Sequence, residues 1–351
     1  MLNSLYYKSL NYKTFINFEV DDTDSSFLKD KWNDMSFSKS MDDFSIAAGD
    51  GSFNKKKFLE FNFCPVDAES LIFDDELMRV EQSEIFEIGH VGFLDELLSN
   101  YMSIFELKCC LKSLVQYGVD YYLFDGSIFG DLQNPYPMGA KLPADIRSNL
   151  DGGVLSYLEK DILDLSSLDL SFPLIKKVFR HIDKNKNDGN VYDLHLSSIE
   201  KLLVLKEILM YNEKIISISK SSSSNDIFVS NIPDIAIFDK YTYRSGISKI
   251  CYKTVDRNFP VANDFFNNLE FTIFYLRLVD YQSVLKVELP YRADMDMIID
   301  IVKIINRDLV GGYPYLLKKA HNDVVITNNH VDELLKIGKI YETTNREQLK
   351  M

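Results

Sequence analysis

Two apolar segments of this chain end in the same triplet, Asp-Gly-Ser. The first segment, residues 44–52, ends in the triplet that begins at Asp50, and the second, residues 119–127, ends in the triplet that begins at Asp125. Residues 93–117 lie between them and carry apolar side chains at spacings of three and four, which predicts one long helix. A strand, a helix and a second strand in this order favour one sheet with both triplets at the same edge.

The other predicted elements also mix strands with helices. Short apolar runs and apolar alternation predict strands, whereas capping residues and apolar side chains at helical spacing predict helices. Further strands are expected at residues 57–63, 71–73, 85–88, 215–219, 271–278, 284–289 and 324–327, and further helices at residues 294–307, 314–321 and 330–338, the last capped by Asn329. This order predicts an α/β fold with a mixed central sheet, flanking helices and a largely helical insertion.

The length of 351 residues suggests about two domains, or one large domain with insertions. Residues 1–44 are polar and acidic without a clean period, and we expect them to form an N-terminal arm or cap. Residues 45–150 and 213–351 are expected to form the two halves of the core, the second half with the C-terminal helices. Residues 151–212 are expected to form the helical insertion.

The net charge of the chain is −14, from 39 Lys and Arg residues against 53 Asp and Glu residues. This acidity excludes a compact basic module that coats nucleic-acid phosphates over one whole face, but it leaves room for a local cationic site. The four cysteines form no CxxC pair, which predicts reduced side chains rather than a zinc site. The sequence shows no secretory leader and no apolar run of about 18 residues, so we expect a soluble cytoplasmic protein without a membrane span.

Asp50 and Asp125 are the first candidates for chemistry. A single Asp-Gly is usually a turn, but two of them at equivalent strand ends are expected to bring both carboxylates together. Two nearby carboxylates repel each other unless a cation lies between them, and hard divalent cations prefer such oxygen ligands. The repeated triplet therefore predicts a metal site at this edge of the sheet.

Glu106 and His321 are further candidate ligands. Glu106 lies on the long predicted helix among apolar residues, where a carboxylate is costly unless it is paired or bound to a metal. The alternative is a boundary residue paired with Lys108 or Lys112. His321, near the end of a short predicted helix, is either a cation at a helix C-terminus or a nitrogen ligand or acid–base group. A mixed set of Asp, Glu and His ligands suits Mn²⁺ as well as Mg²⁺.

Two cationic residues are candidates for substrate contacts. Lys220 follows the apolar run 215–219, and Arg277 shares one face of the predicted strand 271–278 with Tyr275. A cation at a strand end can offset the charge that grows on a phosphate. Arg277 is either a buried ion-pair partner or a phosphate-binding residue.

An ordered set of short motifs resembles the archaeal NurA nucleases. The set runs through most of the chain, from about residue 46 to about residue 340, and it is far more specific than any of its parts. Its members are Ala-Gly-Asp50-Gly51-Ser52, Glu106-Leu107, Leu-Phe-Asp125-Gly126-Ser127, Ile-Ser-Lys220-Ser221, Phe-Tyr275-Leu-Arg277-Leu, and Gly312-Tyr313-Pro314-Tyr315-Leu316-Leu317 followed by Ala320-His321-Asn322.

The resemblance implies a fold and an activity. The fold is an RNase H-like, PIWI-like mixed sheet, so that residues 45–150 and 213–351 would be the two halves of a nuclease core. The activity is Mn²⁺-dependent cleavage of DNA, with Mg²⁺ as an alternative ion and two ions in the site, by a 5′–3′ exonuclease and single-strand endonuclease. Members of the family form homodimers and act with the hexameric HerA translocase in DNA end resection and double-strand break repair.

The resemblance also implies roles for seven residues. It implies catalytic metal ligands at Asp50, Glu106, Asp125 and His321, and substrate-binding residues at Lys220, Tyr275 and Arg277. The rival interpretation is a non-catalytic RNase H-like adaptor or regulator of a DNA translocase, and a weaker rival is a phosphoesterase that acts on small nucleotides. The ligand set argues against the adaptor, because an adaptor has no need to gather costly carboxylates.

Overall fold

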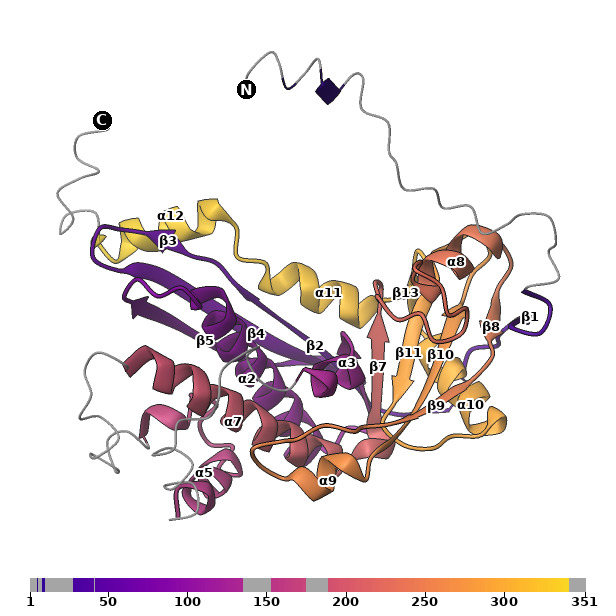
Figure 1. The fold of residues 1–351 in the computed structure, drawn as a ribbon, viewed down its shortest axis with the longest axis horizontal. Coiled ribbons are helices and arrows are strands. Elements are labelled where there is room, and N and C mark those ends of the chain that lie inside the picture. The colour runs from indigo at the N-terminus through magenta and orange to yellow at the C-terminus, as the bar shows by residue number, and fades with distance from the viewer. Residues whose placement is uncertain are drawn as a thin grey trace.

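An eleven-stranded mixed sheet organises the part of the chain that the computed structural model describes, namely residues 5, 8–9, 28–40, 42–134, 153–174 and 189–340. Its strand order is β1-β8-β10-β11-β7-β6-β2-β4-β3, with β5 beside β4 and β9 beside β10 (Figure 1). The strands are β1 (Trp32–Asp34), β2 (Ile46–Phe53), β3 (Lys56–Lys57), β4 (Asn62–Asp74), β5 (Glu76–Ile88), β6 (Tyr121–Asp125), β7 (Ile215–Ser219), β8 (Gly246–Ser248), β9 (Cys251–Thr254), β10 (Glu270–Arg277) and β11 (Leu285–Leu289). A separate ribbon joins β12 (Leu309–Val310) to β13 (Tyr313–Pro314). The predicted α/β architecture with a mixed central sheet is confirmed.

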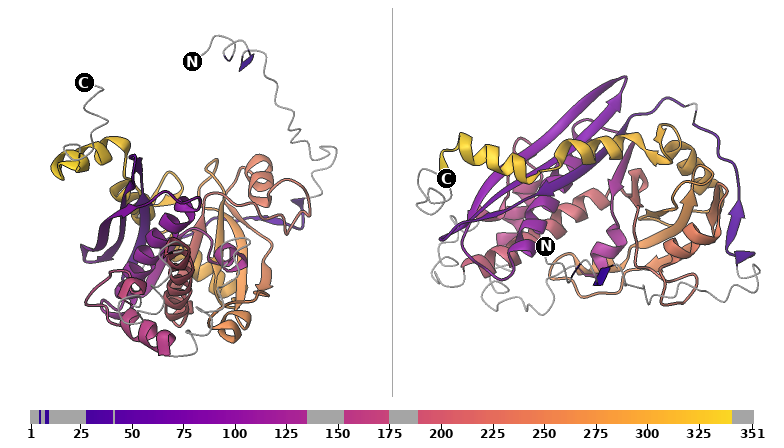
Figure 2. Two further views of the ribbon diagram at one scale, coloured as in Figure 1. Left: turned by 60° about the vertical axis from the view of Figure 1, so that its left-hand side comes forward. Right: turned by 90° about the horizontal axis from the view of Figure 1, so that it is seen from above.

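Helices cover both faces of this sheet (Figures 1 and 2). They are α2 (Leu94–Val115), α3 (Ile128–Gln133), α5 (Leu155–Ile162), α7 (Gly189–Leu209), α8 (Asp234–Tyr241), α9 (Asn263–Asn267), α10 (Met295–Ile305), α11 (Tyr315–Val324) and α12 (Asn328–Ile337). The core on one face includes α2, α3, α5 and α7, and the core on the other face includes α10 and α11. In β2, Ala47 belongs to the first core and its neighbours Ile46 and Ala48 to the second, because successive side chains of a strand point to opposite faces.

The parallel centre of the sheet brings the two Asp-Gly-Ser triplets together. β2 pairs in parallel with β6, so that Gly49 lies opposite Phe124, and β6 pairs in parallel with β7. Asp50 and Asp125 directly follow that pair and lie at the same edge of the sheet, as predicted. The prediction that the first triplet lies at a strand end is wrong, because pairing with β4 continues β2 as far as Phe53.

Two short strands expected after the first triplet, residues 71–73 and 85–88, are parts of one long hairpin. β4 and β5 pair antiparallel from Asn62 opposite Ile88 up to the turn at Asp75. β5 forms an edge of the sheet, and most of its side chains are exposed. The sequence of β5 therefore shows no regular alternation of apolar and polar residues over its full length.

The later elements follow the predictions with two exceptions. The long helix α2, the strand β7, the β10–β11 hairpin and the helix α10, which Asp294 caps, form where they were predicted. The strand expected at residues 324–327 is not found in this described stretch: Val324 ends α11, and residues 325–327 form an irregular connection to α12. Thr327 rather than Asn329 caps α12, since its hydroxyl accepts a hydrogen bond from the His330 amide at 3.2 Å.

Only parts of the expected arm and of the expected insertion are among the described residues. Within the arm, residues 32–34 form β1, which pairs antiparallel with β8, while residues 10–27 lie outside the described part. Within the insertion, α5 and α7 are helical as predicted, while residues 175–188 lie outside it. Among the helices that the structure describes, none combines the length and the apolar character needed to cross a lipid bilayer.

Candidate active site

Asp50 and His321 meet where α11 packs on β2. The Nδ1 atom of His321 lies 2.7 Å from Oδ2 of Asp50, and Oδ1 of Asp50 accepts a hydrogen bond from the Gly51 amide at 2.8 Å. These contacts fix the orientation of the carboxylate. The Asp50 side chain is 18% exposed and the His321 side chain is 54% exposed. The pair is therefore open on one side to a ligand from solvent.

Arg79 on β5 holds α11 in place against the sheet. Its guanidinium lies 3.0 Å from a carboxylate oxygen of Glu69 on β4 and 2.7 Å from a carboxylate oxygen of Asp323 on α11. Burial raises the pKa of Glu69 to about 7, although the neighbouring Arg79 charge lowers it. Glu69 lies opposite Asp50 in the register of β2 and β4. The bridge through Arg79 thus fixes the helix of His321 relative to Asp50.

Asp125 lies at the end of β6 beside Lys220 and Tyr313. The Nζ atom of Lys220 is 3.6 Å from Oδ2 of Asp125 and 4.0 Å from the centre of the Tyr313 ring. Burial raises the pKa of Asp125, the Lys220 charge lowers it and the Asp50 charge raises it. The Tyr313 hydroxyl is buried beside Asp125 without a hydrogen bond of regular geometry to a described atom. This corner of the site combines a carboxylate, an ammonium group and a phenol.

Glu106 reaches the same site from α2. It is 7% exposed, and burial is the main cause that raises the pKa of its carboxyl well above its usual range. The charges of Asp50, Asp131 and Asp125 raise that pKa further, and the Lys201 charge lowers it. The electrostatic coupling shows that Glu106, Asp50 and Asp125 share one region, although they come from three different elements.

The pairing expected as an alternative for Glu106 does not form. The Nζ atom of Lys108 lies 2.9 Å from a carboxylate oxygen of Glu200 and donates a hydrogen bond to the Ser171 hydroxyl at 2.9 Å. Among the described residues, neither Lys108 nor Lys112 forms an ion pair with Glu106. Within the described part of the chain Glu106 is therefore a buried acid without an ion pair, which is costly unless a cation is bound.

The donor set at this site suits a hard divalent cation. The Asp50 charge raises the pKa of both Glu106 and Asp125, and the His321 imidazole adjoins Asp50. Carboxylates and an imidazole gathered in this way are ligands that such a cation accepts. In the described part of the chain, however, no three His, Cys, Asp or Glu side chains are arranged closely enough to surround one ion. The His321 ring rests against Asp50 and the Lys220 ammonium rests against Asp125. The residues fit a cation chemically, and holding one requires some of these side chains to shift.

Tyr275 and Arg277 lie in the interior and not at this site. The Tyr275 ring packs against the Phe238 ring with centres 5.2 Å apart. The Arg277 guanidinium donates to the Thr242 carbonyl at 2.8 Å and lies 3.5 Å from the Asp239 carboxylate. Of the two interpretations of Arg277, the buried ion-pair partner agrees with this arrangement. A direct substrate contact is not available to either side chain here, because each is at most 3% exposed.

A buried charge pair on β11 is absent from the predicted site residues. Glu288 accepts a hydrogen bond from the Ser127 hydroxyl at 2.6 Å and lies 2.7 Å from the Lys286 ammonium. It thereby holds Ser127, the last residue of the second Asp-Gly-Ser triplet, against β11. The sequence signal is a Lys and a Glu two residues apart within an apolar strand, which places both on one face. Tyr313 is likewise absent from the predicted site residues, although it belongs to the motif that begins at Gly312.

Comparison with known proteins agrees with the motif pattern. The sequence model described as the NurA domain matches residues 44–326. The "Probable DNA double-strand break repair nuclease NurA" of Methanocaldococcus jannaschii is 27% identical over 370 aligned positions, which cover 94% of this chain and 87% of that protein. The "DNA double-strand break repair nuclease NurA" of Saccharolobus solfataricus is 26% identical over 307 positions, which cover 83% of this chain and 79% of that protein.

Solved structures show the same fold. The NurA nuclease from Sulfolobus solfataricus superposes with a TM-score of 0.71 at 21% identity, covering 98% of this chain and 96% of that one. A NurA crystal structure with manganese superposes with a TM-score of 0.67 at 16% identity, covering 95% of this chain and 96% of that one. Because the domain match extends over most of the chain and includes Asp50, Glu106, Asp125 and His321, this protein belongs to the NurA family.

Proposed function

We propose that this chain hydrolyses phosphodiester bonds in DNA with the help of divalent cations. The observation that carries the proposal is Glu106, a buried carboxylate that forms no ion pair within the described part of the chain and shares one region with Asp50 and Asp125. A bound cation removes the cost of gathering these charges, whereas a purely structural role does not. The names of the related proteins, which are DNA double-strand break repair nucleases, support the same chemistry here.

In this proposal Asp50, Glu106, Asp125 and His321 hold two Mn²⁺ ions, with Mg²⁺ as the alternative. Cations bound in this way lower the pKa of water and offset negative charge on a phosphate. Asp50 would be the central ligand of such a site, because its charge acts on Glu106 and on Asp125 alike. The related crystal structure with manganese supports this choice of ion.

Lys220 is the residue of this chain proposed to meet the substrate phosphate. Its side chain is 48% exposed, so the ammonium group can leave Asp125 for a phosphate oxygen without crossing the interior. The Tyr313 ring beside it limits the positions that the ammonium group adopts. A positive charge placed in this way stabilises the charge that develops on the phosphate during cleavage.

The finer assignments belong to the same proposal. They are 5′–3′ exonuclease and single-strand endonuclease activity, a homodimer, and action with a hexameric HerA-type translocase in end resection. Membership of the NurA family supports them. The division into residues 1–44, 45–150, 151–212 and 213–351 also remains a proposal. It is supported by the sheet, in which β2 and β6 from the first half of the core lie beside β7 and β11 from the second half.

A nuclease assay tests the proposal. Single-stranded and duplex DNA labelled at the 5′ or the 3′ end are incubated with the protein and Mn²⁺, Mg²⁺ or a chelator, with and without a HerA-type hexamer. We expect cleavage with Mn²⁺ and none with the chelator, and release of 5′-terminal nucleotides first. Absence of cation-dependent cleavage under all these conditions contradicts the proposal and favours the non-catalytic adaptor. Cleavage of small nucleotide esters alone favours the phosphoesterase.

A further inference from the structure

A cluster of buried polar side chains lies beside the turn that follows Asp125. Its members are Ser217 and Ser219 on β7 and Lys286 and Glu288 on β11, each at most 5% exposed. In the register of the two strands, Ser219 lies opposite Lys286 and Ser217 lies opposite Glu288. Residues directly opposite each other point to the same face of a sheet, so the four side chains adjoin one another. A buried ion pair adds little net stability, because taking two charges out of water costs about as much free energy as their attraction provides. The cluster therefore calls for a role other than stability.

Glu288 fixes the course of the chain directly after Asp125. Its Oε1 atom accepts a hydrogen bond from the Ser127 hydroxyl at 2.6 Å, and its Oε2 atom accepts one from the Phe129 amide at 3.0 Å. The Ser127 hydroxyl in turn accepts a hydrogen bond from the Gly130 amide at 2.9 Å and caps α3. Both carboxylate oxygens thus hold the turn between β6 and α3.

The two serines of β7 hold the same turn by its backbone. Ser217 and Ser219 both donate hydrogen bonds from their hydroxyl groups to the Gly126 carbonyl, at 2.6 and 2.7 Å. Gly126 directly follows Asp125, and Ser219 directly precedes Lys220. The residue after the carboxylate is therefore linked to the residue before the ammonium group.

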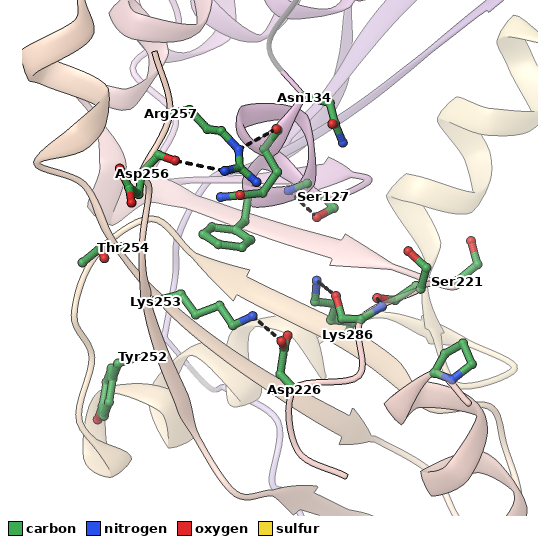
Figure 3. A pocket seen from close by; sticks show the side chains of 17 residues that line it. Ser127, Asn134, Ser221, Asp226, Tyr252, Lys253, Thr254, Asp256, Arg257 and Lys286 are labelled. Carbon is green, nitrogen blue, oxygen red and sulfur yellow. Dashed lines mark hydrogen bonds and ion pairs between the residues drawn. The ribbon is translucent and has the colours of Figure 1, made fainter. Parts of the chain in front are cut away.

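Lys286 fastens the chain on the far side of Lys220. Its Nζ atom donates a hydrogen bond to the Ser224 hydroxyl at 3.1 Å. Lys286 and the serine run 221–224 line one polar pocket (Figure 3). The same Nζ atom lies 2.7 Å from Oε1 of Glu288. One ion pair therefore joins the segment after Lys220 to the turn that Glu288 holds.

We propose that Lys286 and Glu288 are positioning residues, which act through their contacts to hold Asp125 and Lys220 at a fixed separation. The inference rests on the proposed function, in which Asp125 holds a cation and Lys220 meets the substrate phosphate. The Lys220 Nζ atom is 3.6 Å from Oδ2 of Asp125. A misplacement of about 1 Å lowers a rate by roughly 10²-fold, so a rigid connection between the two groups raises kcat. The pair itself is too deeply buried to contact DNA.

The main test variant is Lys286→Met/Glu288→Gln, which removes both charges and keeps the approximate side-chain volumes. Either single substitution leaves a buried charge without its partner and is expected to destabilise the fold strongly. The melting temperature of the double variant should lie within about 5 °C of that of the unmodified protein. The amide of glutamine has only one acceptor oxygen, so it cannot hold both Ser127 and Phe129. We therefore expect kcat for Mn²⁺-dependent cleavage of single-stranded DNA to fall at least roughly tenfold.

The ion pair of Lys108 and Glu200 offers a matched control. It is also buried, with the Nζ atom 2.9 Å from a carboxylate oxygen. Glu200 accepts hydrogen bonds from the amides of Ser171 and Phe172 at 2.8 Å each, so it fastens a segment that contains no candidate site residue. Lys108→Met/Glu200→Gln should change the melting temperature by a similar amount and leave kcat unaltered. Equal losses of kcat in both pair variants overturn the proposal, because they indicate a general effect of buried pairs on the fold.

A double-mutant cycle with Lys220→Ala separates positioning from a general loss of stability. The separation of Asp125 and Lys220 matters only while the lysine is present. Lys286→Met/Glu288→Gln should therefore lower kcat much less in a Lys220→Ala background than in the unmodified protein. Losses of kcat that multiply in full overturn the proposal.

Ser127→Ala is the second variant, which removes one contact of Glu288 and leaves both charges in place. It should lower kcat about threefold, the usual effect of one lost hydrogen bond. An unaltered kcat in Ser127→Ala overturns the positioning role even where the pair variant does not fold. If the unmodified protein cleaves no DNA with Mn²⁺, the proposed nuclease function fails and the positioning role fails with it. If it does cleave DNA and Lys286→Met/Glu288→Gln cleaves equally fast, only the positioning role fails.

Discussion

Replacing Asp50 with asparagine is expected to lower the rate of Mn²⁺-dependent DNA cleavage by a factor of roughly 10³ or more. Asparagine has the same size as aspartate but carries no negative charge. Asp50 is the carboxylate whose charge acts on both Glu106 and Asp125, so its loss disturbs the whole proposed cation site. The measurement is the initial rate on labelled single-stranded DNA at saturating Mn²⁺.

The fold should survive Asp50→Asn. The amide can still accept a hydrogen bond from Gly51, and it relieves repulsion among the carboxylates. Thermal unfolding in the absence of metal is therefore expected to be unchanged or higher. Asp95→Asn is the control, because Asp95 is an exposed partner of Lys55 at the start of α2. A cleavage rate in Asp50→Asn equal to that of the control contradicts the assignment.

Glu106→Gln is expected to abolish cleavage and to stabilise the metal-free protein. The variant removes a buried carboxyl group that has no ion pair among the described residues and that is exposed to the charges of three other carboxylates, Asp50, Asp131 and Asp125. A substitution that raises stability and abolishes activity at once is typical of a residue whose role is to bind a ligand rather than to stabilise the fold. We expect the melting temperature of the metal-free variant at pH 8 to exceed that of the unmodified protein by about 3 °C or more.

The stabilisation by Glu106→Gln should depend on pH in a defined direction. Burial raises the pKa of Glu106 in the folded state above that in the unfolded chain. The stability contributed by its bound proton is therefore complete below the unfolded pKa, about 4.3, and is lost as pH rises through the folded pKa. The difference in melting temperature between variant and unmodified protein should be small at pH 5 and should widen toward pH 8.

Mn²⁺ should reverse this order of stability. A ligand that binds only the folded state raises its stability by mass action, so Mn²⁺ is expected to raise the melting temperature of the unmodified protein at pH 8. Glu106→Gln should respond much less. A variant that is less stable than the unmodified protein at pH 8 without metal would show that Glu106 has a structural partner, and it would remove the main support for the cation site.

The centre of the fold, and with it the edge of the sheet where Asp50 and Asp125 lie, could be predicted because these features depend on local sequence signals. The apolar runs before Asp50 and Asp125 mark buried parallel strands, and the spacing of apolar residues marks the helix that carries Glu106. The order of these elements then determines which residues meet. His321 could be placed only through the motif resemblance, because the contact between α11 and β2 joins residues that are 271 positions apart.

The remaining features depend on partners that the local sequence does not reveal. β5 lies at a sheet edge with exposed side chains, so its pairing with β4 leaves little apolar pattern. Tyr275 and Arg277 lie on one face of β10, but only the packing of α8 against that face shows that it is interior. From the sequence alone, Lys286 and Glu288 are expected at the surface. In the structure β11 is buried, and the two side chains form an ion pair in the interior.

The net charge of −14 is explained in part by the candidate site. Part of it is concentrated in the carboxylates of the candidate site, where charges are costly without a cation. At the site the cationic group is local, namely the half-exposed Lys220 beside Asp125. Such a chain is expected to hold DNA weakly and in a salt-dependent way, and to use its cationic groups for positioning rather than for tight binding.

Direct titration with Mn²⁺ tests the central claim most simply. The paramagnetic signal of free Mn²⁺ is followed while protein is added, for the unmodified chain and for Asp125→Asn, each in the absence of DNA. We expect the unmodified chain to bind Mn²⁺ with up to two ions per chain, and we expect Asp125→Asn to bind at least roughly tenfold more weakly. Equal binding by both proteins, or no binding by either, would contradict a cation site formed by Asp50, Glu106, Asp125 and His321.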